Sequence, residues 1–274
     1  SEVTEIDRAG HRVIVRSTVD GSIGEVAYDR LVLSMGASPV RPPIPGYERA
    51  RTLRTVEDAA RLASDVEVAP RTAVVIGAGF IGLEMAENLI GQGLDVTVVE
   101  ATPQVLPPLD PELAILVADE LRDHGVHVET GTSVASIEAR TVTLADGRVL
   151  PADLVVGAIG VRPDARLAEA AGLELGASGG IRVDEVNRTS DPDIYAVGDA
   201  AEKSDAISRA TSLIALANVA NRHGRRVADH IAGRPVRPVA SLGTARTSVS
   251  PEDTTSSVST ASTMGLGEIG RAHV

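Results

Sequence analysis

The chain of 274 residues contains no cysteine. It therefore has no disulfide bond, no catalytic thiolate and no cysteine ligand for a metal. Tryptophan is also absent, and with one Phe and three Tyr the core has to be built from Ala, Val, Leu and Ile. Lys and Arg number 26 against 38 Asp and Glu, a net charge of −12. This excess of negative charge gives no electrostatic reason to bind nucleic acid or an anionic membrane.

Long apolar runs are missing as well. None approaches the roughly 20 residues that cross a bilayer, and no signal peptide opens the chain. We therefore expect a cytoplasmic protein that does not contact a membrane. The six histidines form no ligand pattern: His124 and His127 flank a turn, while His223 and His230 share an expected helix. We expect histidines of the surface or of packing contacts, and no metal site.

Three glycines at G-x-G-x-x-G spacing stand between an apolar run and a helical pattern. The run of residues 74–76 leads into Gly77, Gly79 and Gly82. In such a motif the first glycine permits a tight turn and the second lets a pyrophosphate approach the backbone. The third lets the helix pack closely on the strand, so that its positive N-terminus faces the phosphates. The segment predicts a dinucleotide-binding site.

An acidic residue ends the next apolar run. Residues 96–99 are followed by Glu100, 21 positions after Gly79. A carboxylate at this place can accept hydrogen bonds from the 2′- and 3′-hydroxyls of an adenosine ribose. It would repel a 2′-phosphate, so we expect the site to prefer NADH to NADPH.

The chain repeats one pattern at an offset of 124 residues. In residues 29–39 and again in 153–163, an acid, an apolar strand, a glycine and a proline follow one another, each time after an expected β-hairpin. The second copy closes the unit that contains the glycine motif. A matching motif for the first copy would fall near position 77 − 124 = −47, before Ser1. We therefore expect two Rossmann-type units, the first of them truncated.

A further constellation lies in TSDPDIYAVGD, residues 189–199. Residues 194–197 predict a short strand, Gly198 permits a close backbone approach, and Asp199 stands at an expected helix start. Asp199 can cap that helix. Alternatively, its carboxylate accepts a bond from a ribityl hydroxyl while the helix N-terminus faces a flavin phosphate. The residues by themselves leave both interpretations open.

Together these segments resemble the FAD- and NAD(P)-dependent pyridine nucleotide-disulfide oxidoreductases. The resemblance covers about residues 1–243 and rests on the glycine motif with Glu100 and on residues 34–46, 158–164 and 189–199. The stretches TPQVLPPLD (102–110) and LANVANRHGRRVADHIAGRPV (216–236) are similar to coenzyme A-disulfide reductases and to their NADH oxidase and NADH peroxidase relatives.

The resemblance implies FAD and NADH as cofactors. For FAD it implies contacts from Gly36, Ala37, Thr189 and Asp199. For NADH it implies contacts from Gly77, Gly79, Phe80, Ile81, Gly82, Glu100 and Gly160. It places Glu84 near the contact of nicotinamide and flavin, which we favour over the alternative of a partner for the helix dipole. It places Asn221 near the substrate.

The resemblance also implies an α/β fold in which the NAD domain is inserted in the FAD domain and the first FAD-binding unit is missing. We expect residues 1–50 to be a remnant of the FAD domain, 51–164 the NAD domain, and 165–237 the continuation of the FAD domain. Residues 238–274 would begin a truncated interface domain. The last seven, 268–274, resemble the translation of a sequencing adapter, and we expect an artefact there.

Three helices are expected from local signals. The helix of residues 56–64 opens with Thr55 as its cap and Asp58 three positions later, which is capping-box spacing. Residues 111–123 follow Asp110 as a cap and precede Gly125, and a third helix ends before Gly233 and Pro235. The core face expected for the second helix consists of Leu113, Leu116, Val117 and Leu121.

The implied function is hydride transfer from NADH to FAD and onward to a disulfide such as coenzyme A disulfide, to oxygen or to peroxide. The family's redox cysteine is absent, so we expect this fragment to be inactive and its parent to be a homodimer acting on a small molecule. One alternative is a ferredoxin-reductase-like flavoenzyme without a thiol relay, although the acidic charge disfavours an acidic ferredoxin partner. Another is an inactive NAD-binding fragment.

Overall fold

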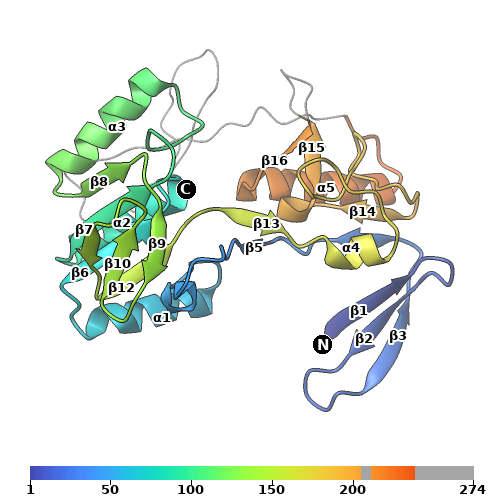
Figure 1. Ribbon diagram of the computed structural model, residues 1–274. Helices are drawn as coiled ribbons and strands as arrows, with labels where there is room; N and C mark the ends of the chain where they lie inside the picture. Colours follow the sequence, from blue (N-terminus) through green and yellow to red (C-terminus); the bar gives the residue numbers. More distant parts are fainter. Residues whose placement is uncertain (205–210, 238–274) are drawn as a thin grey trace. The chain divides into compact units, whose positions relative to one another are not determined.

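A computed structural model describes residues 1–204 and 211–237 (Figure 1). The predictions made for residues 238–274 lie outside this range. The described residues form two compact units, one of residues 1–38, 162–204 and 211–237 and the other of residues 39–161. Each unit has its own buried core.

The unit of residues 39–161 is built on a parallel sheet with the strand order β12-β6-β7-β8. Its strands are β6 (Thr72–Ile76), β7 (Asp95–Glu100), β8 (His127–Thr130) and β12 (Leu154–Gly157). Valines dominate these strands because both faces of the sheet are covered. Ala73 and Val75 pack on the helical side, whereas Val74 and Ile76 belong to the core on the other side. The predicted α/β Rossmann-type fold is confirmed.

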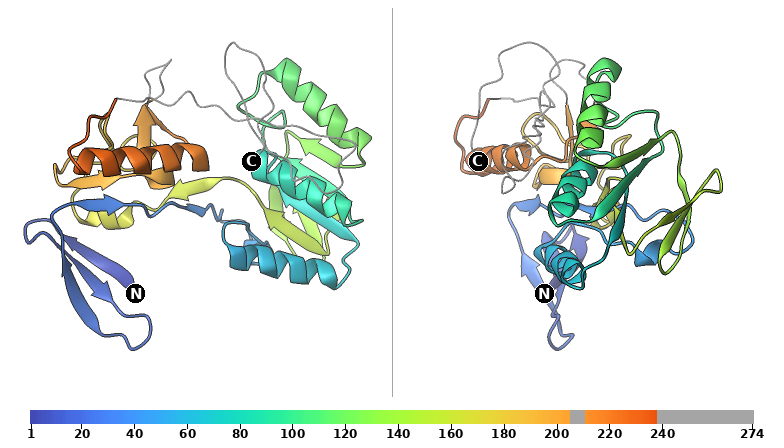
Figure 2. Two further views of the ribbon diagram at one scale, coloured as in Figure 1. Left: turned by 180° about the vertical axis from the view of Figure 1, so that it is seen from behind. Right: turned by 90° about the vertical axis from the view of Figure 1, so that its left-hand side faces the viewer.

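Three helices and a small antiparallel sheet cover the two faces, as the right-hand view of Figure 2 shows. The helices are α1 (Val56–Glu67), α2 (Phe80–Gly91) and α3 (Pro111–Asp123). The small sheet contains β9 (Val134–Ile137), β10 (Thr141–Leu144) and β11 (Val149–Pro151), and the last two form the predicted hairpin. The 3-10 turn η1 (Tyr47–Arg49) buries Tyr47 in this core, so the unit begins at Pro39, earlier than the boundary expected after residue 50.

The three predicted helices are present, but α1 extends to Glu67 instead of residue 64, Asp110 makes no side-chain capping bond, and one face of α3 differs. The capping box of Thr55 and Asp58 is formed in both directions, and α3 has the predicted bounds. In α3, however, the expected burial of Leu113 and Leu116 is wrong, because they are 49% and 64% exposed. The small residues Ala114 and Ala118 lie against the core in their place, together with Leu121. Residues 113–118 are continuously apolar, so the sequence pattern alone left the orientation of the helix undetermined.

The other unit combines short sheets and one long helix. Its first 27 residues include the antiparallel strands β1 (Glu2–Asp7), β2 (Arg12–Arg16) and β3 (Ile23–Ala27), of which β2 and β3 form the predicted hairpin. A parallel pair, β4 (Leu31–Leu33) and β14 (Ile194–Ala196), carries the core residues Leu33 and Ile194. The remaining elements are α4 (Arg166–Ala170), η2 (Gly198–Ala200), β15 (Glu202–Ser204), β16 (Thr211–Leu213) and α5 (Ala217–Ile231).

The chain passes between the units twice, through β5 (Ala37–Pro39) and β13 (Val161–Pro163), and these two strands pair. Helix α5 ends before Gly233, whose φ is 71°, as predicted. Within the described part of the chain, no helix has the length and apolar character needed to span a bilayer.

Candidate nucleotide-binding site

The glycine motif forms the turn between β6 and α2. Gly77 has a φ of 103°, and a Cβ atom on it would lie 2.5 Å from the carbonyl oxygen of Ala158. A Cβ atom on Gly82 would lie 1.9 Å from the carbonyl oxygen of Gly77. Backbone atoms therefore exclude any side chain at both positions, which is what the tight turn and the close packing of helix on strand require.

Gly79 is different from these two glycines. No heavy atom lies within 4 Å of the place where its Cβ would be, and its φ of −77° suits any residue. Neither strain nor crowding inside the protein accounts for a glycine here. The open space lies directly before Phe80, the first residue of α2, where the N-terminus of the helix attracts anions. The residues present thus fit the pyrophosphate of a dinucleotide.

Glu100 lies at the carboxyl end of β7 and joins it to the glycine turn. Its side chain accepts hydrogen bonds from the backbone N–H groups of Ala78 (at Oε2) and Thr102 (at Oε1), each at 2.8 Å. The residue is 8% exposed. Two amide donors fix the orientation of the carboxylate, and its remaining lone pairs can accept the ribose hydroxyls.

Leu106 also supports the turn and was not predicted as a site residue. Its backbone N–H donates to the carbonyl of Ala78 at 2.8 Å, and its side chain is 3% exposed. Its φ of 45° is unusual for leucine and indicates a backbone held in place by its surroundings. A positive φ outside glycine leaves no signal in the sequence. The segment 102–110 attracted attention only through its family resemblance.

The other residues predicted for NADH lie in the same unit. Phe80 and Ile81 form the first turn of α2, with Ile81 40% exposed, and Glu84 follows on the same helix. Gly160, with a φ of 97°, follows β12, the parallel neighbour of β6, and its Cβ position is also open. The carboxyl ends of neighbouring parallel strands lie at the same edge of a sheet. Gly79, which follows β6, and Gly160, which follows β12, are therefore at the same edge.

Among the residues predicted for FAD, Gly36 and Asp199 are brought to one sheet edge. The parallel strands β4 and β14 pair Leu33 with Ala196, and the chain continues from them to Gly36 and to Gly198. Both glycines have left-handed φ values, 72° and 73°. Ala37 follows Gly36 and is buried.

One detail of the FAD-related predictions differs from expectation, and the role of Thr189 stays a prediction. Asp199 does not begin an α-helix: it lies inside the 3-10 turn η2, whose N-cap residue is Val197, so the interpretation as a helix cap is wrong. Thr189 lies before the amino end of β14, and its hydroxyl accepts a bond from the N–H of Asp191 at 3.1 Å. The length of β14 separates it from Asp199.

Helix α5 carries Asn221, which is exposed, and His223, which is 5% exposed. Nδ1 of His223 lies 3.2 Å from Nδ2 of the buried Asn187. Burial, with the charges of Lys203 and Arg226 as smaller causes, lowers the pKa of His223 to about 4. Over the described residues, no group of three or more acidic or histidine side chains is placed to hold a metal.

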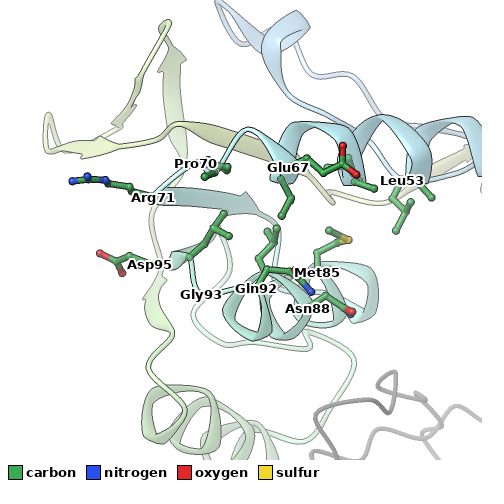
Figure 3. Close-up of a pocket in the computed structure, with 16 residues that line it drawn as sticks. Leu53, Glu67, Pro70, Arg71, Met85, Asn88, Gln92, Gly93 and Asp95 are labelled. Atoms are coloured by element: carbon green, nitrogen blue, oxygen red, sulfur yellow. The ribbon is translucent and has the colours of Figure 1, made fainter.

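A groove of about 970 Å³ lies between α1 and α2, away from the glycine turn (Figure 3). Leu62, Met85 and Leu89 contribute to its apolar lining, and Arg71 and Asp95 lie where β6 and β7 begin. None of the predicted site residues lines it. The nucleotide edge of the sheet, at the carboxyl ends of the strands, is therefore a separate place.

The model of the family "Pyridine nucleotide-disulphide oxidoreductase" matches residues 1–224. The chain belongs to this family. It is 40% identical over 221 residues to the NADH oxidase of Methanocaldococcus jannaschii, which covers 78% of the chain and 49% of that relative. It is also 40% identical over 185 residues to the nitric oxide reductase FlRd-NAD(+) reductase of Aeromonas salmonicida, covering 65% of the chain and 47% of the relative. The chain spans about half the length of the curated relatives it matches.

Solved structures agree with this assignment. Reduced CoADR-RHD of Bacillus anthracis superposes with a TM-score of 0.86 at 42% identity, covering 89% of this chain and 45% of that one. The NAD-dependent persulfide reductase of A. fulgidus gives 0.85 at 41% identity, covering 89% and 46%. The family uses FAD and NADH, so the predicted cofactors are confirmed at the level of the family.

Proposed function

We propose that the chain supplies the NADH-binding unit and part of the FAD-binding unit of a flavoprotein oxidoreductase. The observation that carries this proposal is the contrast within the glycine motif. Backbone atoms leave no room for a side chain at Gly77 and Gly82, while the Cβ position of Gly79, at the start of α2, is open. A dinucleotide pyrophosphate needs that combination of a rigid turn and one unobstructed approach.

Each part of the site then has a role. The first turn of α2 and the backbone at Gly79 hold the pyrophosphate. The carboxylate of Glu100 accepts hydrogen bonds from the ribose hydroxyls and repels a 2′-phosphate. Gly36, Ala37 and Asp199 contribute to holding FAD, and Glu84 lies near the nicotinamide. Bound FAD would supply the redox chemistry, namely uptake of a hydride from NADH and delivery of two electrons to an acceptor. The protein supplies binding and orientation for that chemistry.

For the acceptor we propose a small molecule: a disulfide such as coenzyme A disulfide, oxygen or peroxide. Similarity to an NADH oxidase and to a persulfide reductase supports this choice. A relay through a thiol would require a cysteine that these 274 residues do not contain. Electron delivery to a protein partner is the second candidate, and the equal identity to the Aeromonas reductase supports it. The homodimer and the cytoplasmic location stay predictions.

The first experiment is a titration of the 274-residue chain with NADH and with NADPH, followed by nicotinamide fluorescence. We expect saturable binding of NADH and at least roughly tenfold weaker binding of NADPH, about 1.4 kcal/mol. Loss of binding in Gly79→Val, with an unchanged melting temperature, would assign the binding to the glycine turn. Tighter binding of NADPH, or NADH binding that Gly79→Val leaves intact, would refute the proposed site.

The second experiment identifies the acceptor. The chain is mixed with FAD and NADH without oxygen, and flavin absorbance is followed while coenzyme A disulfide, oxygen, peroxide or a ferredoxin is added. Reoxidation by one of the small molecules supports the first candidate. Reoxidation by the ferredoxin alone supports the second, and an unchanged flavin absorbance on adding NADH contradicts both for this chain.

A further inference from the structure

Lys203 is the only lysine in the chain, whose other 25 basic residues are arginines. It lies on β15, a few residues after the η2 turn that contains Asp199. Its side chain is buried, with the residue 3% exposed. Lysine is among the residues that are almost never fully buried without partners. A single lysine at a buried position, in a chain that otherwise uses arginine, calls for a specific reason.

The partners of this lysine are three carbonyl oxygens. Nζ donates to Gly198 at 2.5 Å, to Ala201 at 3.0 Å and to Ile214 at 3.3 Å. An ammonium group has three N–H donors that diverge from one atom, so it can serve three carbonyls that surround it. The planar guanidinium of arginine spreads its donors in a fork and cannot occupy the same point. The arrangement therefore explains why this position holds lysine.

The bond to Gly198 has a consequence for the neighbouring residue. In a trans peptide unit the C=O and the following N–H point in opposite directions. Because the carbonyl of Gly198 is directed toward Lys203, the N–H of Asp199 is directed to the other side. Ala201 shows the same relationship: its carbonyl accepts from Lys203, and the next N–H, that of Glu202, donates to the carbonyl of Ile181 at 2.9 Å.

The third carbonyl extends this arrangement to another element. Ile214 follows β16 and precedes α5, which packs against η2. One ammonium group thus connects the Gly198–Asp199 turn with the segment that leads into α5. Burial lowers the pKa of Lys203, and the nearby charge of Asp199 opposes that effect.

We propose that Lys203 is a positioning residue that fixes the Gly198–Asp199 turn and directs the N–H of Asp199 toward FAD. The proposal rests on the proposed function, because it takes FAD as the cofactor of this turn. The lysine itself does not touch the cofactor. It acts by binding the carbonyl of Gly198, which points away from the N–H of Asp199 in the same peptide unit.

The first test uses the single lysine as a probe. Growth with ¹⁵N-labelled lysine gives one side-chain ammonium resonance, and we expect its protons to exchange slowly with water at neutral pH. Lys203→Met and Lys203→Arg should both shift the backbone N–H resonances of Asp199 and Ala215, the groups that follow two of the bound carbonyls. Arg234→Met, which removes an exposed cation from the same unit, should leave them unchanged. A rapidly exchanging ammonium, or an unshifted Asp199 N–H in Lys203→Met, would overturn the proposal.

The second test measures FAD affinity by quenching of flavin fluorescence. We expect at least roughly tenfold weaker FAD binding in Lys203→Met, about 1.4 kcal/mol, and no rescue in Lys203→Arg although the charge is kept. Affinity should remain unchanged in Arg234→Met. Equal affinity in Lys203→Met and the unaltered chain would refute the positioning role. If the unaltered chain does not bind FAD, these residues alone do not hold the cofactor, and the resonance of Asp199 decides the role of the lysine separately.

Discussion

The Oε2 atom of Glu100 and the backbone N–H of Ala78 are joined by a hydrogen bond of 2.8 Å. This bond connects the end of β7 with the middle of the glycine turn, across 22 residues of sequence. The residue expected to recognise the ribose therefore also holds the loop expected to bind the pyrophosphate. Nucleotide specificity and the shape of the turn depend on the same carboxylate.

Replacement of Glu100 should therefore affect binding and stability together. We expect Glu100→Ala to lower the unfolding free energy by roughly 2–4 kcal/mol, because two backbone N–H groups lose a charged acceptor. NADH affinity should fall about tenfold while NADPH affinity does not. Urea unfolding and fluorescence titration measure the two effects. Glu112→Ala, at an exposed position of α3, is the control, and an unaltered preference for NADH in Glu100→Ala would contradict the assignment.

The glycines of the turn should respond differently to substitution. Gly79→Val adds a side chain in open space, so we expect a melting temperature close to that of the unaltered chain but little NADH binding. Gly82→Ala places a Cβ 1.9 Å from the carbonyl oxygen of Gly77, and we expect it to destabilise the unit by about 1–3 kcal/mol. Thermal unfolding and NADH titration of both variants distinguish the two roles. A strongly destabilised Gly79→Val would show that the space is needed for folding.

His223 should make stability depend on pH. Its pKa is about 4 in the folded chain, whereas an ordinary solvent-exposed histidine, as in the unfolded chain, has a pKa of 6.5. The unfolded chain therefore binds the proton more readily. The unfolding free energy is therefore highest above pH 6.5. It decreases by up to about 3 kcal/mol as the pH falls toward 4. Protonation would also replace the acceptor at Nδ1 by a donor facing the Asn187 amide.

The measurement for His223 is the unfolding free energy of the chain and of His223→Gln as a function of pH. We expect the difference between the two to shrink as the solution is acidified. His127→Gln, an exposed position, serves as the control for general effects of histidine. Parallel pH profiles for the chain and His223→Gln would refute the prediction.

The capping box of α1 offers a local test. Thr55 accepts from the N–H of Asp58, and the Asp58 carboxylate accepts from the N–H of Thr55. We expect Thr55→Ala to reduce the unfolding free energy by about 1 kcal/mol and Thr55→Ser to have little effect. Chemical denaturation measures both. Equal losses in the two variants would mean that the methyl group, and not the hydroxyl, stabilises the helix.

Features that depend on local chemistry were predictable from the sequence. The turn at Gly77 and Gly82 follows from the missing side chains, and the start of α1 follows from the spacing of Thr55 and Asp58. The hairpins and the bounds of α3 follow from short-range signals in the same way. These contacts form between residues close in the chain, so a linear pattern contains the needed information.

Other features required the tertiary structure. Leu113 and Leu116 are exposed because alanines of α3 face the core, a choice made by the surface on which the helix packs. Leu106 adopts a positive φ, and its N–H donates a hydrogen bond to the carbonyl of Ala78, 28 residues earlier in the chain.

The sequence by itself determined the parallel sheet and the position of the nucleotide motif, because these depend on glycine spacing and apolar periodicity. The family followed from the resemblance of several segments to known members. Only the tertiary structure decided that Asp199 lies in a 3-10 turn and that Lys203 lies beneath that turn. A buried ammonium group is stable only where carbonyls converge from several segments, here from η2 and from the end of β16. No pattern within one segment encodes such a convergence.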